Sequence, residues 1–237
     1  MSAKKILVIN SKGGVGKSTL SSNLASFYAC KGLHTALCDF DRHMPGVRWL
    51  GRRDSSRPKI DSLTGWEYSR MDDYDWIIMD TPTGMARKDL RSLILRSDAI
   101  IIPVLPSPLD FHVAADFIHD LLIYGKIRAT EKPLAVVANR TRTNTMMYDQ
   151  LQRFLQSLKV PIATSIRDSQ NYIHASFHGI GIFEMNPTIV GYDLEQWQPL
   201  LQWIDRSLNK HQMHTRREHP RALARPMNDR PLLHAVN

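Results

Sequence analysis

The chain has 237 residues, of which 43% are hydrophobic and 23% charged. This composition supports a packed core and excludes a wholly disordered chain. Lys and Arg outnumber Asp and Glu by 31 to 23, and the resulting net charge of +8 favours a polyanionic partner. The two cysteines, Cys30 and Cys38, exclude a disulfide framework and a zinc cage and favour a cytoplasmic setting. No apolar run approaches the ~18 residues of a membrane span.

Short apolar runs alternate with longer segments of helical periodicity. Buried strands are predicted at 6–9, 35–38, 76–79, 99–104, 134–138 and 161–165, and helices at about 17–31, 87–96, 110–125, 146–158, 169–178 and 194–209. Unbroken apolar strands indicate a sheet covered by helices on both faces. The alternation therefore predicts an α/β fold, a doubly wound and mostly parallel sheet with helices on both faces.

Two segments depart from this rhythm. Residues 42–66 are basic and weakly periodic, and we expect a solvated loop there. Residues 210–237 hold six of the Lys and Arg residues and three prolines, which predicts a basic, mobile tail. The sequence thus predicts a single domain over 1–209, followed by that tail.

The strongest motif lies directly after the first predicted strand and opens a predicted helix, at residues 10–19. Glycines there let successive backbone N–H groups point at phosphate oxygens, and a helix N-terminus favours an anion. In such a P-loop Lys17 reaches the β- and γ-phosphates of ATP and Ser18 binds Mg²⁺. The first glycine of the generic P-loop pattern is replaced by Ser11.

A second lysine, Lys12, makes the motif more specific. The loop then resembles the deviant Walker A motif, K-G-G-x-G-K-[ST], of the ParA/MinD family of partition and positioning ATPases. By this resemblance the nucleotide is bound by Lys12, Gly13, Gly14, Val15, Gly16, Lys17, Ser18 and Thr19. The resemblance covers about residues 1–205, and the family implies a Mg-dependent hydrolysis of ATP to ADP and phosphate.

Three further segments follow in the family's order. The D-x-D segment ends at Asp41, which together with Lys12 and Lys17 is a catalytic candidate. Directly after it, Arg42-His43 replaces the family's usual Pro-Gln. An apolar run ends in Asp80, which resembles the Walker B acid. Carboxylates suit a hard cation, so Ser18, Asp41 and Asp80 are the predicted Mg²⁺ residues. A strand ends at Asn139, the position that contacts adenine in this family.

In the family, the lysine at the Lys12 position crosses a dimer interface to the phosphates of the other subunit. A cation supplied in trans stabilises charge on the transferring phosphoryl group. The resemblance therefore implies a homodimer in the ATP state that hydrolysis releases. It also implies a cargo-linked partner protein that stimulates the ATPase.

Family members act on one of two surfaces, DNA or membrane. Basic residues favour non-specific DNA, and the candidate contacts are Arg140, Arg142, Arg153, Arg206, Arg216 and Arg217. This implies a nucleoid-associated protein of the cytoplasm. An apolar stripe over 194–208 is compatible with a membrane anchor but is more typical of a core-facing helix, so membrane binding is not expected.

The cargo is a plasmid, a chromosome or a protein compartment. The stretch 107–122 resembles members encoded beside bacterial carboxysomes. The alternatives are a MinD-like membrane-associated positioning ATPase and a metabolic P-loop synthase or kinase. A binding module with a dead ATP site is disfavoured because Lys17, Ser18, Asp41 and Asp80 occur together.

Overall fold

Seven parallel strands form one sheet in the order β3-β2-β4-β1-β5-β6-β7. The structure, a computed structural model, describes residues 2–64, 68–124, 132–142, 146–157 and 160–218. The strands are β1 (Lys4–Val8), β2 (Thr35–Asp39), β3 (Ile60–Thr64), β4 (Trp76–Asp80), β5 (Ala99–Val104), β6 (Leu134–Thr141) and β7 (Ile162–Arg167). The predicted doubly wound parallel sheet is confirmed.

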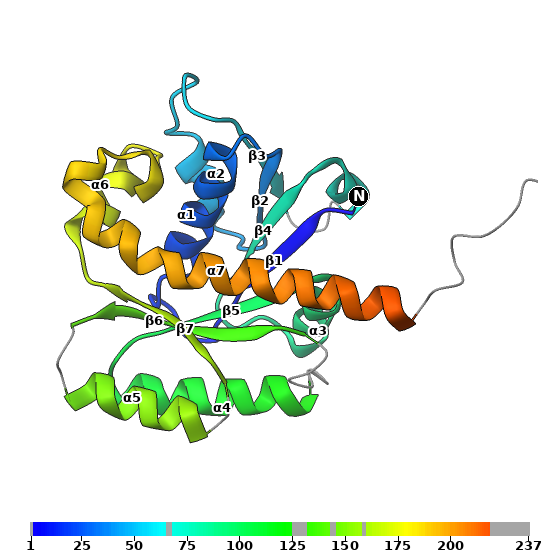
Figure 1. Cartoon of the computed structure of the whole chain (residues 1–237), viewed down its shortest axis with the longest axis vertical. Coiled ribbons are helices and arrows are strands. Elements are labelled where there is room, and N and C mark those ends of the chain that lie inside the picture. The colour runs from blue at the N-terminus through cyan, green and yellow to red at the C-terminus, as the bar shows by residue number, and fades with distance from the viewer. Residues whose placement is uncertain (1, 65–67, 125–131, 143–145, 158–159, 219–237) are drawn as a thin grey trace, which may run out of the picture.

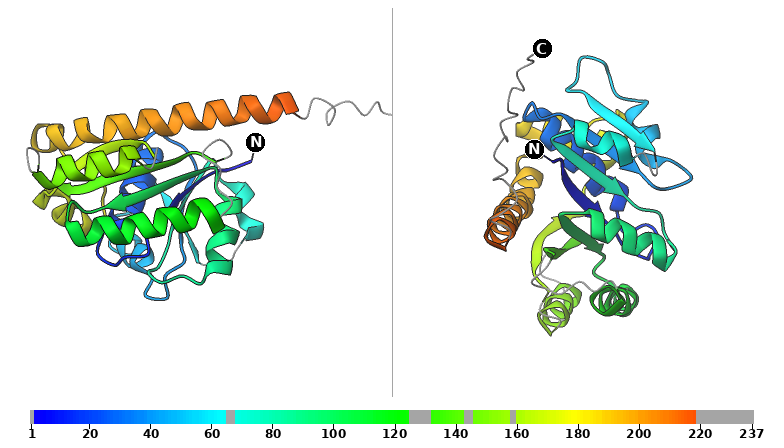
Figure 2. Two further views of the ribbon diagram at one scale, coloured as in Figure 1. Left: turned by 90° about the horizontal axis from the view of Figure 1, so that it is seen from below. Right: turned by 90° about the vertical axis from the view of Figure 1, so that its right-hand side faces the viewer.

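Helices cover both faces of this sheet (Figures 1 and 2). They are α1 (Lys17–Cys30), α2 (Pro45–Leu50), α3 (Arg87–Arg96), α4 (Pro108–Tyr124), α5 (Met146–Ser157), α6 (Gln170–Phe177) and α7 (Pro187–Glu218). Two short 3-10 turns are added, η1 (Tyr68–Asp73) and η2 (Ile182–Glu184). Helices α1 and α7 bury their apolar sides on one face of the sheet, and α3, α4 and α5 bury theirs on the other.

Alternating side chains of each central strand supply the two cores. Ile6 and Val8 of β1 join the core beneath α1 and α7, whereas Leu7 joins the core beneath α3, α4 and α5. All three are fully buried, which is why the strand reads as an unbroken apolar run. The sheet is therefore a rigid platform whose carboxyl edge carries the loops described below.

The predicted loop at 42–66 contains an edge strand and a helix that sequence periodicity did not reveal. Along β3 only Ile60 and Leu63 are buried, because the strand lies at the sheet edge and pairs on one side only. Helix α2 spans six residues, begins with Pro45 and buries Gly46 and Trp49. Elements this short carry too few apolar positions to show a period.

Helix α7 is longer than the predicted 194–209. Asn186 caps it by accepting a hydrogen bond from the Thr188 N–H (3.0 Å), and Pro187 occupies the first helical position. The helix runs on to Glu218 and passes beyond the edge of the sheet (Figure 1), so the predicted boundary at residue 209 falls inside it. No proline interrupts the chain between 199 and 220. The rest of the predicted tail, 219–237, lies outside the described residues.

The apolar stripe of α7 faces the core. Its buried members are Trp197, Leu200, Leu201, Ile204 and Leu208. The core-facing interpretation of this stripe is confirmed, so the same side chains are not exposed for lipid. Among the helices that the structure describes, none has the length and apolar character needed to cross a membrane.

Candidate nucleotide-binding site

The glycine-rich loop connects the central strand β1 to helix α1. Gly14 and Gly16 adopt left-handed conformations, with φ of 74° and 95°, which glycine adopts without steric penalty. Gly16 precedes α1, and no side chain caps the first turn of that helix. Its free N–H groups and the helix dipole together form a site for an anion.

Side chains within the loop hold its shape. Asn10 donates through Nδ2 to the Pro103 carbonyl at the end of β5 (2.7 Å) and accepts the Lys12 N–H (2.9 Å). Lys17 donates through Nζ to the Lys12 carbonyl (3.0 Å), so its ammonium group lies inside the loop. Burial lowers the pKa of Lys17, whereas the nearby charges of Asp80 and Asp41 raise it. The sequence predicted a role for Lys17 but not for Asn10, because an amide side chain after a strand is no distinctive signal.

Asp80 lies at the carboxyl end of β4, directly beside Asp39 at the end of β2. Its Oδ1 accepts the Ser21 hydroxyl (3.2 Å), and the Ser18 hydroxyl is close enough to lower the pKa of this carboxyl. Its Oδ2 is buried and has no hydrogen-bond partner among the described residues. Burial, followed by the charge of Asp39, raises the pKa of Asp80 to about 7.

These features fit a divalent cation. An orphaned buried carboxylate oxygen beside a serine hydroxyl offers the oxygen ligands that Mg²⁺ takes, and a cation there would favour the ionised form of Asp80. Ser18 and Asp80, predicted as metal residues, are therefore brought together. Asp41 is close enough for its charge to act on Lys17.

The two acids of the D-x-D segment have different surroundings. Asp39 is buried, and its carboxylate accepts the N–H groups of Asp41 (2.9 Å) and Gly46 (2.7 Å), which fixes the loop between β2 and α2. Asp41 is partly exposed and accepts the His43 N–H (2.9 Å). Asp39 thus shapes the loop, and Asp41 is the member that remains accessible. Sequence reasoning did not assign Asp39 this role.

Lys12 forms an ion pair with Asp110 in the first turn of α4. Asp110 is buried, and its other carboxylate oxygen accepts the Ser107 hydroxyl. The ammonium group of Lys12 is therefore held within its own chain. In the sequence, Asp110 was one residue of a family-like segment, and its partner could not be read from spacing.

Asn139, near the end of β6, also contacts the glycine-rich loop. Its Nδ2 donates to the Val15 carbonyl (2.8 Å), and a Cβ at Gly16 would lie 2.2 Å from the same nitrogen. Beside it a cavity of about 550 Å³ is lined by residues that include Thr19, Asn139 and Arg140. The cavity lies between the first turn of α1 and the end of β6, beside the residue predicted to contact adenine.

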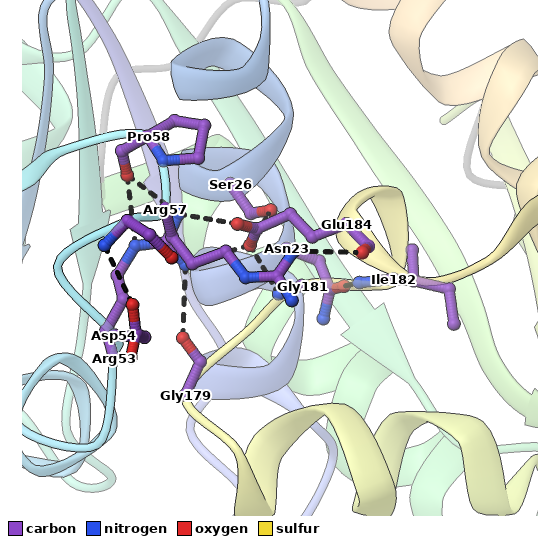
Figure 3. Close-up of polar contacts among 11 residues, drawn as sticks. Asn23, Ser26, Arg53, Asp54, Arg57, Pro58, Gly179, Gly181, Ile182 and Glu184 are labelled. Carbon is purple, nitrogen blue, oxygen red and sulfur yellow. Dashed lines mark hydrogen bonds and ion pairs between the residues drawn. The ribbon is translucent and has the colours of Figure 1, made fainter.

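A buried ion pair joins three segments that are distant in the sequence (Figure 3). Arg53, in the loop after α2, donates to both carboxylate oxygens of Glu184 (2.7 and 2.8 Å) and to the carbonyls of Pro58 and Gly179. Glu184 also accepts the Ser26 hydroxyl of α1 (2.7 Å). Although burial opposes ionisation, hydrogen bonds from Arg53 hold the pKa of Glu184 below its usual range.

The basic residues proposed to contact DNA are distributed over several elements of the fold. Arg153 lies on α5 and Arg206 on α7, and these helices cover opposite faces of the sheet. Arg140 lines the cavity beside Asn139, and Arg142 follows β6. Arg216 and Arg217 belong to the last turns of α7, and their side chains lie outside the described part of the chain.

A strand–loop–helix of this geometry at the centre of a parallel sheet, with an acid ending the neighbouring strand, defines a P-loop nucleotide-binding protein. The sequence pattern of the CobQ/CobB/MinD/ParA nucleotide binding domain matches residues 6–182. The chain belongs to this family, and the resemblance to ParA/MinD proteins is confirmed.

Individual relatives agree with this placement. The chain is 28% identical, over 76% of its length and 87% of the relative, to "Maintenance of carboxysome distribution protein A" of Halothiobacillus neapolitanus. Its fold is similar to the ATP complex of a substituted McdA from Cyanothece (TM-score 0.66, 16% identity, 88% of this chain and 98% of that chain). It is also similar to the MinD cell division protein of Aquifex aeolicus (TM-score 0.64, 20% identity, 87% and 97%).

Proposed function

We propose that this protein is a ParA-like ATPase that dimerises on binding ATP, binds DNA without sequence preference and leaves it after hydrolysis. In this way it positions a cargo. The observation that supports the proposal most is the pair of lysines in one phosphate loop. The Lys17 side chain lies inside the loop, whereas the Lys12 side chain extends away from it to an ion pair with Asp110.

Each residue of the site has a chemical role in this proposal. Loop N–H groups and Lys17 bind the phosphates, and Ser18 and Asp80 would hold Mg²⁺, which neutralises charge on the phosphate oxygens. Asp41 orients the attacking water. For Lys12 to reach a partner's phosphates it must leave Asp110, so dimer formation exchanges an internal ion pair for an intersubunit one.

Dimerisation is tested with Lys12→Ala in an Asp41→Ala background. Asp41→Ala should stop turnover and accumulate the ATP-bound dimer, which size-exclusion chromatography with light scattering would detect in Mg-ATP. Adding Lys12→Ala should return the protein to monomers. The control Lys31→Ala removes an exposed lysine at the end of α1 and should leave the dimer intact. A dimer that persists without Lys12 would contradict the role in trans.

DNA binding is tested by fluorescence anisotropy with two duplexes of unrelated sequence. Both should bind the ATP-state protein similarly and release it as salt rises, because cation–phosphate contacts release counterions. Binding of equal strength in ADP would reject the nucleotide switch. Vesicles of anionic lipid in the same assay test the MinD-like alternative, which the buried stripe of α7 disfavours.

For the cargo we propose a protein-bounded compartment, because the relative from Halothiobacillus neapolitanus is described as a carboxysome distribution protein. A partner protein on that cargo would stimulate hydrolysis. In cells a fluorescent fusion should follow the nucleoid, and cargo spacing should be lost in Asp41→Ala. ATPase activity stimulated by a small acid, rather than by DNA and a protein, would instead support a metabolic synthase or kinase.

A further inference from the structure

We propose that a groove between α3 and α4 docks a protein segment that carries both acidic and apolar side chains. We call this feature the α3 groove, and its apolar lining includes Met85, Leu90, Ile94, Phe117 and Leu121. The proposal rests on the proposed function in one respect, since the groove would be the binding site for the partner that stimulates hydrolysis. The groove lies on the sheet face away from α1 and α7.

The α3 groove is a cavity of about 460 Å³. Ile94 and Leu121 are buried at its base, and Met85, Leu90 and Phe117 are partly buried around them. Sites for small organic groups span roughly 300–1,000 Å³ and are mostly apolar, so this cavity is large enough for apolar side chains of a partner. Filling it would remove apolar surface from water, which drives association.

Cations lie along one rim of the groove. Arg87, Lys88 and Arg91 of α3 are exposed and line it. Arg87 makes an exposed ion pair with Asp120 of α4 (3.4 Å). Within the part of the chain that the structure describes, Lys88 and Arg91 make no ion pair. Their charges therefore remain for an acidic occupant.

Local stability does not explain these cations. Arg87 and Lys88 lie in the first turn of α3, where the positive end of the helix dipole disfavours them, and Asp89 is the one acid in that turn. An acidic partner would remove this repulsion. Electrostatic complementarity of this kind increases association rates and selects partners.

The groove adjoins the nucleotide loops. Its wall includes Ser11, which precedes Lys12, and Pro82 and Gly84, which follow Asp80. An occupant would therefore contact both loops that flank the phosphate site. Duplex DNA can match the cationic rim but has no flexible apolar side chain to fill the cavity, so a protein segment fits the two features together.

The test begins with a random peptide library displayed on phage. Peptides are selected for binding to the wild-type protein and depleted against Arg91→Glu. The selected sequences should combine Asp or Glu with Leu, Phe, Met or Trp. A synthetic peptide of that sequence should bind wild type by fluorescence anisotropy at least about tenfold more tightly than Lys88→Glu or Arg91→Glu. Lys31→Glu, an exposed charge reversal at the end of α1 on the opposite face, is the matched control and should bind normally.

Several outcomes would overturn the proposal. These are peptides without acidic residues, no enrichment over the depleted pool, equal binding by Arg91→Glu, or competition by duplex DNA. Loss of the ATP-dependent dimer in Arg91→Glu would assign the groove to a second copy of the chain and would also overturn it. Peptide binding is measured in Lys12→Ala as well, where it should persist. Failure of the dimer switch is thereby distinguished from failure of the docking site.

Discussion

Glu184→Gln should destabilise the protein strongly because it removes one charge from a buried pair. The Arg53 and Glu184 side chains are 7% and 2% exposed. All five guanidinium N–H groups of Arg53 have acceptors, which are Glu184, Pro58 and Gly179. The charge of Arg53 would therefore be left buried and without a counter-charge.

The size of the effect follows from the geometry. Oε2 of Glu184 accepts three hydrogen bonds, from Arg53, Ser26 and the Gly181 N–H, whereas Oε1 accepts one from Arg53. In the variant the amide oxygen can take the place of Oε2. The amide NH₂ group then takes the place of Oε1 and faces an Arg53 N–H, and two donors cannot form a hydrogen bond. Removing one partner of a buried pair costs about 3–5 kcal/mol. We expect a loss of about 3 kcal/mol in the free energy of unfolding.

Urea unfolding followed by circular dichroism measures this loss. Lys59→Met is the matched control, because its ion pair with Asp61 lies nearby but the lysine is exposed, and the midpoint should hardly move. Arg53→Met, Glu184→Leu and their combination complete a double-mutant cycle, in which the double variant should lose about 2 kcal/mol less than the sum of the single variants. Additive losses, or a loss in Glu184→Gln no larger than in the control, would refute this reasoning.

Three further changes test the site itself. Asp80→Asn should stabilise the nucleotide-free protein more at pH 8 than at pH 5. Burial raises the pKa of Asp80 to about 7, so the wild type loses stability as pH rises from about 4 through 7. Equal gains in the free energy of urea unfolding at both pH values would contradict this. Gly16→Ala should weaken binding of a fluorescent ATP analogue at least about tenfold through the clash 2.2 Å from the strand-end amide, whereas Gly14→Ala meets no atom within 4 Å and should lose less. Asp110→Asn should lower the protein concentration needed for ATP-dependent dimers in light scattering, because it weakens the internal ion pair, and the exposed Asp116→Asn should not.

The central sheet could be predicted because its strands are buried on both faces. Unbroken apolar runs revealed β1 and β4. Lys17 follows from the glycine-rich motif between β1 and α1, and Asp80 from its position at the end of β4. The edge strand β3 escaped prediction because only two of its residues face the core. Apolar patterns in a sequence reflect burial, and β3 has less of it than β7, the strand at the other edge, which was predicted.

The contacts between distant residues could not be predicted from the sequence. Arg53 and Glu184 are 131 positions apart, and no spacing in the sequence indicates that they pair. The ion pair of Lys12 with Asp110 also depends on how α4 is placed over the sheet. Sequence patterns identified the candidate phosphate-binding residues, but only folding determines which side chains hold them in place.

The position of β1 inside the sheet has a consequence for biosynthesis. This strand is synthesised before both of its neighbours, β4 and β5, which occupy 76–80 and 99–104. An emerging chain therefore exposes an apolar strand that cannot be paired on both sides until residue 104 is available. Parallel sheets with such distant pairing form slowly and are prone to aggregate. Binding of ATP can thus stabilise the folding chain only late, after β4 and β5 have paired with β1.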